Sequence, residues 1–133
     1  MEKLKKKIEN EFINQEGFIK ENNIKLEELK ENYSKISLEI EDKHLNPYGI
    51  VHGGILFALA DTAMGIAART KNENVLTVNA QIDYLKPAKT KKLYATASSI
   101  KIGHTLSVYK TEITDENDKL IAICTGTFIF LEH

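Results

Sequence analysis

Asp61 is the residue of this sequence whose surroundings most favour a chemical role. The stretch from Ile55 to Ala68 is otherwise apolar except for Thr62 and Gly65. Burying an unpaired carboxylate is costly, so a carboxylate kept in such a stretch is a candidate general base. Alternatively, Asp61 faces a polar rim or pairs with Arg69 two turns further on, and Asp61 alone does not decide between these interpretations.

His52-Gly53-Gly54 stands directly before this stretch. Paired glycines at a helix start leave backbone N–H groups uncovered, at the positive end of the helix dipole. Such groups can stabilise the oxyanion that forms during acyl transfer. The alternative is that the glycines only allow a tight join between loop and helix, with His52 an ordinary loop histidine.

These residues need a helix and a loop to position them. The stretch that opens at Gly53-Gly54 and closes with Arg69 and Lys71 predicts a helix that is apolar nearly all round, and therefore buried. Its cations lie near the C-terminal end, where they suit the dipole. Asn46-Pro47-Tyr48-Gly49 predicts the turn that delivers the chain to His52.

Strand-like runs fill most of the remaining sequence. The residues from about Ile24 to Ile40 predict two strands joined by a polar turn. Four runs rich in β-branched and aromatic residues follow the helix and favour an antiparallel meander. They are Val75 to Leu85, Leu93 to Ile102, Leu106 to Thr114 and Leu120 to Phe130.

The predicted fold class is α+β, with one long buried helix wrapped by an antiparallel sheet of about five to six strands. Residues 1–130 are expected to form a single domain, in which 1–20 is an N-terminal helical segment. Within it, about Lys3 to Phe18 predicts a short amphipathic helix. Residues 131–133 resemble the start of an expression tag and are left out of the functional reasoning.

Composition excludes several classes of partner. Lysine plus arginine (18) nearly balances aspartate plus glutamate (19), so the charge favours neither nucleic acid nor an anionic membrane. No segment has the roughly 18 unbroken apolar residues that cross a bilayer. The single cysteine, Cys124, and the lack of a secretory signal favour a reducing compartment, and we expect the cytoplasm.

No metal site or cofactor is expected. The four histidines and one cysteine show no ligand spacing such as CxxC or HxxxH. A hydrolysis that uses a carboxylate and backbone donors does not require a cofactor.

Taken together, these motifs resemble the hotdog-fold thioesterases of the phenylacetate-degradation (PaaI-like) type. The resemblance covers about Ile36 to Phe130 and implies hydrolysis of an acyl-CoA thioester to free acid and CoA. It rests on the run Asn46 to Gly54 followed by Asp61, on Thr77-Val78, on Tyr84-Leu85-Lys86-Pro87-Ala88, and on Lys101-Ile102-Gly103-His104-Thr105.

The resemblance also implies catalytic roles. The Gly53 N–H would polarise the thioester carbonyl, with the Asn46 side chain assisting it or holding water. Asp61 would be the general base that activates water, or a nucleophile that forms a mixed anhydride. Thr77 would orient the water, and His52 would position the substrate or the loop.

Substrate-binding roles follow from the same resemblance. Gly54 lies beside the oxyanion donor, while Tyr84, Lys101, Gly103 and His104 would lie near the pantetheine or phosphate end of CoA. Lys101 is alternatively a solvated surface residue. The acyl group itself is left open.

A second class of function is a non-catalytic acyl-CoA binding or sensing module of the same fold. Regulators of this kind lose the acidic residue and carry an attached DNA-binding domain. This sequence retains Asp61 and has too little chain before Ile24 for such a domain, so the enzyme is favoured.

The spacing of Gly53 and Asp61 predicts an active site shared by two chains. Eight residues on one helix correspond to about 12 Å along its axis, so the two residues cannot both reach one thioester carbon. A homodimer with antiparallel helices would join Asn46, His52 and Gly53 of one chain to Asp61 and Thr77 of the other. The resemblance implies the same, with further pairing into a homotetramer.

Overall fold

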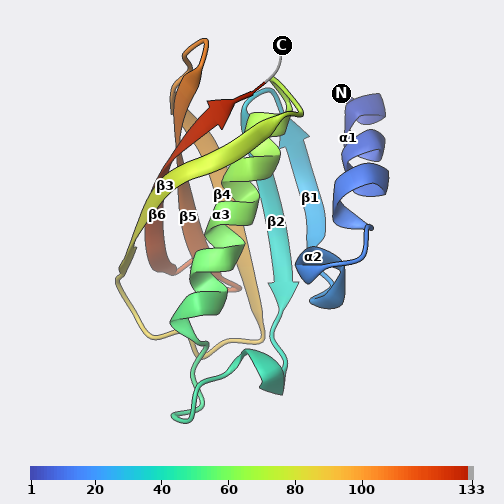
Figure 1. Cartoon of the computed structure of the whole chain (residues 1–133). Coiled ribbons are helices and arrows are strands. Elements are labelled where there is room, and N and C mark those ends of the chain that lie inside the picture. The colour runs from blue at the N-terminus through green and yellow to red at the C-terminus, as the bar shows by residue number, and fades with distance from the viewer. Residues whose placement is uncertain (132–133) are drawn as a thin grey trace.

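A six-stranded antiparallel sheet with one long helix across its face forms the centre of the molecule (Figure 1). The computed structural model describes residues 1–131. The helix is α3 (Gly53–Arg69), and the strand order across the sheet is β1-β2-β4-β5-β6-β3. The strands are β1 (Lys25–Lys30), β2 (Tyr33–Glu39), β3 (Val75–Tyr84), β4 (Lys92–Lys101), β5 (Leu106–Asp115) and β6 (Leu120–Phe130).

The α+β prediction is confirmed, and the four strands after the helix differ from their predicted bounds by at most one residue at each end. The predicted meander, however, is wrong for β3. Strands β4, β5 and β6 pair consecutively, whereas β3 pairs with β6 at the far edge. The segment between Tyr84 and Lys92 therefore passes β6 and β5 to connect the edge strand β3 with β4.

Small residues and buried hydroxyl groups hold α3 against the sheet. Ala60, Ala63 and Ala67 are fully buried, which brings the helix backbone close to the strands. Ser34 Oγ on β2 donates to the Ala63 carbonyl at 2.6 Å, and Thr111 Oγ1 on β5 donates to the Ala60 carbonyl at 2.9 Å. A carbonyl oxygen has two lone pairs, so these bonds add to the helical ones. They fix the turn of α3 that carries Asp61.

The helix is not buried on all sides, which corrects the prediction made from its apolar sequence. Its side chains are fully buried where they face the sheet, but a stripe on the opposite side stays partly exposed. The stripe consists of Phe57, Ala58, Asp61, Thr62 and Gly65. One sheet covers only one side of a helix, so the other side is left for a different partner.

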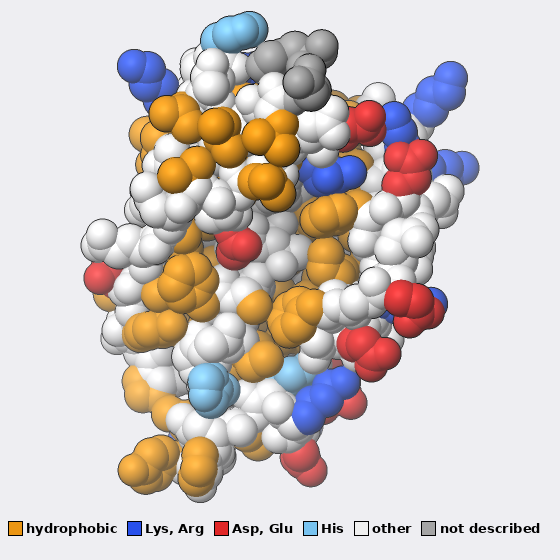
Figure 2. Space-filling view, in the orientation of Figure 1, with side chains coloured by type: hydrophobic (Ala, Val, Ile, Leu, Met, Phe, Trp, Pro, Cys, Tyr) orange, Lys and Arg blue, Asp and Glu red, His pale blue; other side chains and the backbone are white. Residues whose placement is uncertain are grey.

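Strand β3 adds a second open surface beside this stripe. It pairs only with β6, so its outer edge has no partner within residues 1–131. Leu76 and Val78 on β3 are exposed. Figure 2 shows hydrophobic side chains gathered on this face of the molecule. Ten residues of unpaired strand edge beside exposed apolar side chains are a template for pairing with another chain.

The N-terminal segment consists of three short helical pieces: α1 (Glu2–Ile8), the π-helical turn η1 (Glu9–Ile13) and α2 (Phe18–Glu21). The prediction of one helix from about Lys3 to Phe18 is therefore wrong beyond Ile13. Gly17 has φ +146°, a conformation that no helix contains and that glycine permits. Ile8 and Ile13 are buried in the core, which fixes the segment against the sheet domain.

Two sequence-based expectations concern the chain as a whole. No helix within residues 1–131 is long and apolar enough to cross a membrane. Residues 132–133 of the expected tag lie outside the described residues.

His44 connects the N-terminal segment to the loop that precedes α3. Its Nδ1 accepts from the Glu41 N–H at 2.9 Å, and its Nε2 lies 2.8 Å from Asn22 Oδ1. The His44 carbonyl accepts from the His52 N–H at 2.8 Å. An imidazole that accepts at Nδ1 and donates at Nε2 is neutral. Burial is the main cause that lowers the pKa of His44 below its ordinary value of 6.5.

This geometry predicts that acid destabilises the fold through His44. The unfolded chain takes up a proton at this residue as the pH falls below about 6.5, while the folded chain resists protonation, so the free energy of unfolding decreases. Urea unfolding between about pH 7 and pH 5 measures the effect. A His44→Gln variant keeps an acceptor and a donor but cannot titrate there, and we expect its stability to depend less steeply on pH. Equal slopes in the two proteins would contradict the assignment.

Candidate active site

His52 caps the start of α3 and leaves one backbone donor free. Its backbone is extended (φ −61°, ψ 135°), and its Nδ1 accepts from the Gly54 N–H at 2.8 Å. An acceptor at this position satisfies one of the unpaired N–H groups of a helix start. The Gly53 N–H has no acceptor among residues 1–131. The free donor at the positive end of the dipole is thus Gly53.

Tyr84 from the end of β3 packs against this first turn. Its hydroxyl donates to the Gly53 carbonyl at 3.0 Å. A Cβ added to Gly53 would lie 3.2 Å from the ring atom Cζ of Tyr84, so there is little room for any side chain at Gly53. Tyr84 thereby holds the backbone of Gly53 and covers one side of it.

Asn46 organises the loop on the other side of Gly53. Its Oδ1 accepts from the N–H groups of Tyr48 at 2.9 Å and Ile50 at 3.3 Å. Gly49 has φ +78°, which glycine adopts without strain. The side-chain NH2 of Asn46 has no acceptor within residues 1–131. Asn46, Gly53 and Tyr84 line a common cavity of about 300 Å³.

Asp61 and Thr77 form the second polar pair. Thr77 Oγ1 on β3 donates to Asp61 Oδ1 at 2.8 Å, next to a β-bulge between Thr77 and Asn79. The bond occupies one carboxylate oxygen. The alternative pairing of Asp61 with Arg69 is not formed: Arg69 Nη1 donates to the Glu73 carbonyl and its guanidinium lies over the Phe12 ring.

Cys124 on β6 is close enough to Asp61 to be affected by its charge. Burial, and to a lesser degree the Asp61 carboxylate, raise the pKa of the Cys124 thiol to about 11. The thiol therefore stays protonated at neutral pH and is a poor nucleophile. Asp61 remains the group at this place that can act as a base.

The two polar groups face different cavities within one chain. Asp61 and Thr77 line a cavity of about 200 Å³ that does not include Asn46, Gly53 or Tyr84. The helix rise keeps Asp61 about 12 Å from Gly53. Each chain thus presents two half-sites, one with unpaired N–H donors and one with a carboxylate.

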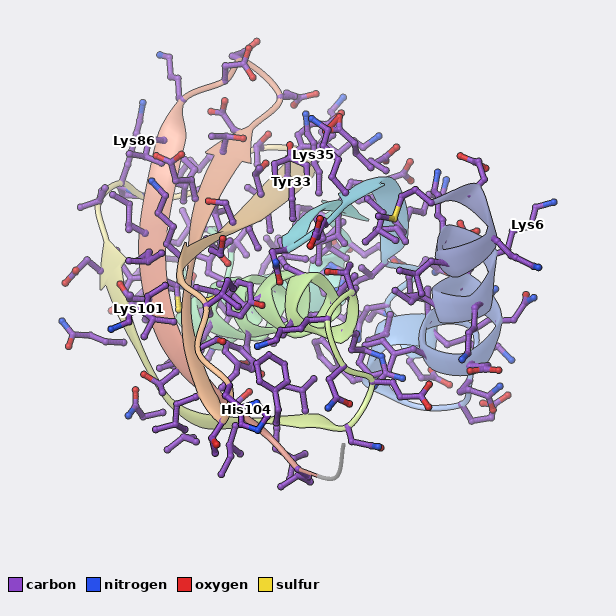
Figure 3. The ribbon with its side chains drawn as sticks, turned by 90° about the horizontal axis from the view of Figure 1, so that it is seen from above. Lys6, Tyr33, Lys35, Lys86, Lys101 and His104 are labelled. Atoms are coloured by element: carbon purple, nitrogen blue, oxygen red, sulfur yellow. The ribbon has the colours of Figure 1, made fainter. Side chains whose placement is uncertain are left out.

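Lys101, Gly103 and His104 lie near the opposite end of α3 from Tyr84. Lys71 Nζ, just past the helix, donates to the Gly103 carbonyl, whereas Tyr84 bonds to the first residue of the helix. The 17-residue helix spans about 24 Å. Figure 3 shows Lys101 on the far side of α3 from Lys6 of α1. One chain therefore does not bring these residues together with Tyr84.

The turn between β4 and β5 explains why residue 103 is a glycine. A Cβ at this position would collide with the Leu106 carbonyl oxygen, so the turn between β4 and β5 requires glycine. Lys101 and His104 are exposed beside this turn. No group of three His, Cys, Asp or Glu side chains among residues 1–131 could hold a metal ion.

Sequence reasoning did not single out Phe12 and Gly65. Both line the cavity of Asp61, Gly65 from α3 and Phe12 from η1. The sequence does contain a signal for Gly65. Glycine destabilises the interior of a helix, so a glycine four residues after Asp61 suggests a specific role. For Phe12, whose partners are distant in sequence, no local signal exists.

Comparisons with known proteins identify the family. The sequence profile of the thioesterase superfamily matches residues 48–122, more than half of the chain. A relative from Archaeoglobus fulgidus that carries an esterase name is 36% identical over 101 residues, which cover 75% of this chain and 66% of the relative. The chain thus spans slightly less than two thirds of that relative's length. The acyl-coenzyme A thioesterase PaaI of Escherichia coli is 30% identical over 99 residues, covering 74% of this chain and 71% of PaaI.

Solved structures agree with the sequence relatives. The structure of the E. coli PaaI protein matches with a TM-score of 0.82 and 28% identity over 85% of this chain and 83% of that one. A Streptococcus mutans protein whose structure contains acetyl CoA matches with a TM-score of 0.78 and 26% identity, over 82% of this chain and 89% of that one. The hotdog fold expected from the sequence is confirmed.

The His52 cap predicts a measurable loss of stability. His52→Ala removes the acceptor of the Gly54 N–H, and we expect the free energy of unfolding to fall by about 1 kcal/mol, as for other helix caps. His52→Asn supplies another good capping side chain and should restore most of the loss. Chemical denaturation of the three proteins measures it. If the His52→Ala and His52→Asn proteins proved equally stable, the bond from the Gly54 N–H to His52 would have no capping role.

Proposed function

Because this chain belongs to the thioesterase superfamily, we propose that it is a thioester hydrolase that acts on acyl-CoA thioesters at a site shared by two chains. The products are the free acid and CoA. The observation that carries the proposal is the separation of a free N–H donor at Gly53 from the carboxylate of Asp61 on one rigid helix. The PaaI thioesterase and the acetyl-CoA-bound structure among the relatives support CoA esters as substrates.

The Gly53 half-site would bind the thioester carbonyl. The unpaired Gly53 N–H at the start of α3 donates to the carbonyl oxygen, and the dipole of the 17-residue helix favours the negative charge that develops there. The free NH2 of Asn46 is a second donor beside the same cavity. Tyr84 keeps the Gly53 backbone in place.

The Asp61 half-site would supply the base. Thr77 holds one carboxylate oxygen, which leaves the other free to take a proton from water. The resulting hydroxide attacks the thioester carbon, and the tetrahedral intermediate collapses by breaking the C–S bond. The CoA thiolate leaves and is protonated. In the alternative route Asp61 attacks directly, and water then hydrolyses the mixed anhydride.

The open surfaces of the chain support a dimer that joins the half-sites. The partly exposed stripe of α3 and the free edge of β3 lie on the same face. In a two-fold contact through this face whose axis is perpendicular to α3, the two helices run antiparallel, so the Gly53 end of one helix would meet the Asp61 turn of the other. Two equivalent sites result, while pairing of dimers into a tetramer stays a prediction.

The mechanism predicts that Asp61→Asn remains folded but loses about two to four orders of magnitude in kcat, the usual contribution of a general base. The amide is nearly isosteric and can still accept the Thr77 bond. Release of free CoA thiol from a good substrate measures the loss. Asp118→Asn in an exposed turn is the matched control and should keep full activity. A folded Asp61→Asn protein with normal turnover would remove Asp61 from the mechanism.

A complementation experiment tests whether the site is shared. One inactive parent carries Asn46→Ala with His52→Ala, and the other carries Asp61→Asn. Refolded together in equal amounts, half of the dimers are mixed, and each mixed dimer has one intact site. We therefore expect about a quarter of wild-type activity to return.

The control pairs two lesions of the same half-site. Asp61→Asn refolded with Thr77→Val damages every shared site, so the mixture should stay at the average of its parents. If the first pair also stays at its parents' average, each site lies within one chain and the shared-site proposal is wrong.

A further inference from the structure

Gly65 lies on the open side of α3, one turn beyond Asp61. A Cβ added to Gly65 would meet nothing within 4 Å, unlike one at Gly53, Gly103 or Gly126. Glycine is less favourable than alanine inside a helix, and Gly65 needs no positive φ. No packing within the described chain explains this glycine. What it provides is empty space next to Asp61.

The space above Gly65 belongs to the cavity that Asp61 and Thr77 border. Its remaining walls include apolar side chains from three elements: Phe12 of η1, Leu76 of β3 and Phe128 of β6. A base held by a threonine hydroxyl thus opens into a largely apolar cavity of about 200 Å³, which Thr62 and Arg69 also border. This combination suits a substrate with a reactive carbonyl and an apolar tail.

Phe12 is a fixed wall of this cavity. The Arg69 guanidinium lies over its ring, with Cζ 4.3 Å from the ring centroid, and Arg69 Nη1 is anchored to the Glu73 carbonyl. Arg69 Nε is buried without an acceptor among residues 1–131, so the ring face is its main neighbour on that side. Ile8 and Ile13 hold the segment on either side of Phe12 in the core.

We propose that the acyl group of the substrate lies across Gly65 and ends against Phe12, so that these two residues set the acyl size. This inference rests on the proposed function, because it places the thioester carbon beside Asp61. The acyl tail then runs from Asp61 over Gly65 to the Phe12 ring. A compact apolar acyl group fits this space, and longer chains meet the wall.

Truncating the wall tests the proposal. For Phe12→Ala, kcat/KM is measured against straight-chain acyl-CoAs from acetyl to palmitoyl. We expect the preferred length to increase, and the first chain that wild type excludes to gain at least about tenfold, since one methylene in an apolar pocket is worth about 10- to 200-fold. Phe12→Leu should shift the profile the same way by less, and it answers the question if the alanine variant does not fold.

Phe18→Ala is the matched control. It is the same truncation on the same N-terminal segment, but Phe18 is 45% exposed and does not border the cavity. Its acyl-length profile should equal that of wild type. A shift of the same size in this variant would trace the effect to a loosened segment and overturn the role of Phe12.

Adding a side chain at Gly65 should have the opposite effect and shorten the preferred acyl chain. Gly65→Ala adds a methyl group to the open space, and we expect a higher melting temperature, because alanine favours the helix. The longest acyl chain that wild type accepts should lose about tenfold or more in kcat/KM, and the loss should become smaller as the acyl chain shortens. Gly65→Leu should restrict the enzyme to the shortest chains.

Three results would overturn the inference, and only the third of them also rejects the proposed function. Unchanged length profiles in Phe12→Ala and Gly65→Ala, with Asp61→Asn inactive, would reject the acyl pocket but keep the mechanism. A uniform loss over all lengths in Gly65→Ala, with dissociation seen by light scattering, would assign the space to the partner chain. Normal turnover by Asp61→Asn would reject the mechanism and the pocket together.

Discussion

The attachment of α3 to the sheet is the interaction on which the rest of the structure depends. The carbonyls of Ala60 and Ala63 flank Asp61 in sequence, and each accepts a bond from a buried hydroxyl on a strand. Removing either hydroxyl would leave the helix less tightly held where its one carboxylate lies. Because the alanine side chains face the strands, Asp61 must face away from them. The same contacts that bury the helix therefore expose its functional side.

For the proposed shared site, a helix fixed in this way leaves a single chain incomplete. Its rise per residue is constant, so no adjustment of the chain can bring the Gly53 N–H to the carboxylate of Asp61. Activity at a shared site is then coupled to association, and a dissociated chain would carry a donor without a base and a base without a donor. The edge of β3 and the stripe of α3 add a second reason to associate, since an unpaired strand edge is a template for pairing and exposed apolar side chains are unfavourable in water. The contact between two chains that completes the proposed active site would thus also cover the exposed edge of β3 and the stripe of α3.

Local patterns in the sequence predicted the elements well because they report on single segments. Alternation and turn residues gave the strand bounds, and His52-Gly53-Gly54 marked the start of α3. Pairings between distant segments were not predictable in this way: β3 lies beside β6, and Phe12 packs against Arg69, which is far from it in the sequence. An apolar helix also looks the same in sequence whether its own sheet or a second chain covers it, so the open stripe was missed.

The residues of the candidate site also differ in whether local sequence patterns could indicate them. Asp61 and Gly53 were proposed from the sequence because a carboxylate and paired glycines stand out at an apolar helix, whereas the roles of Asn46 and Thr77 came from the family resemblance. In the structure Thr77 bonds to Asp61, and Asn46 and Gly53 border a common cavity. Phe12 lies outside the residues 48–122 that match the family and is held by core isoleucines and Arg69 rather than by the catalytic groups. A change in this segment could therefore alter the acyl wall without moving Asp61. Chemistry would then follow from the residues that match the family, while the acyl group accepted would follow from a segment outside that match.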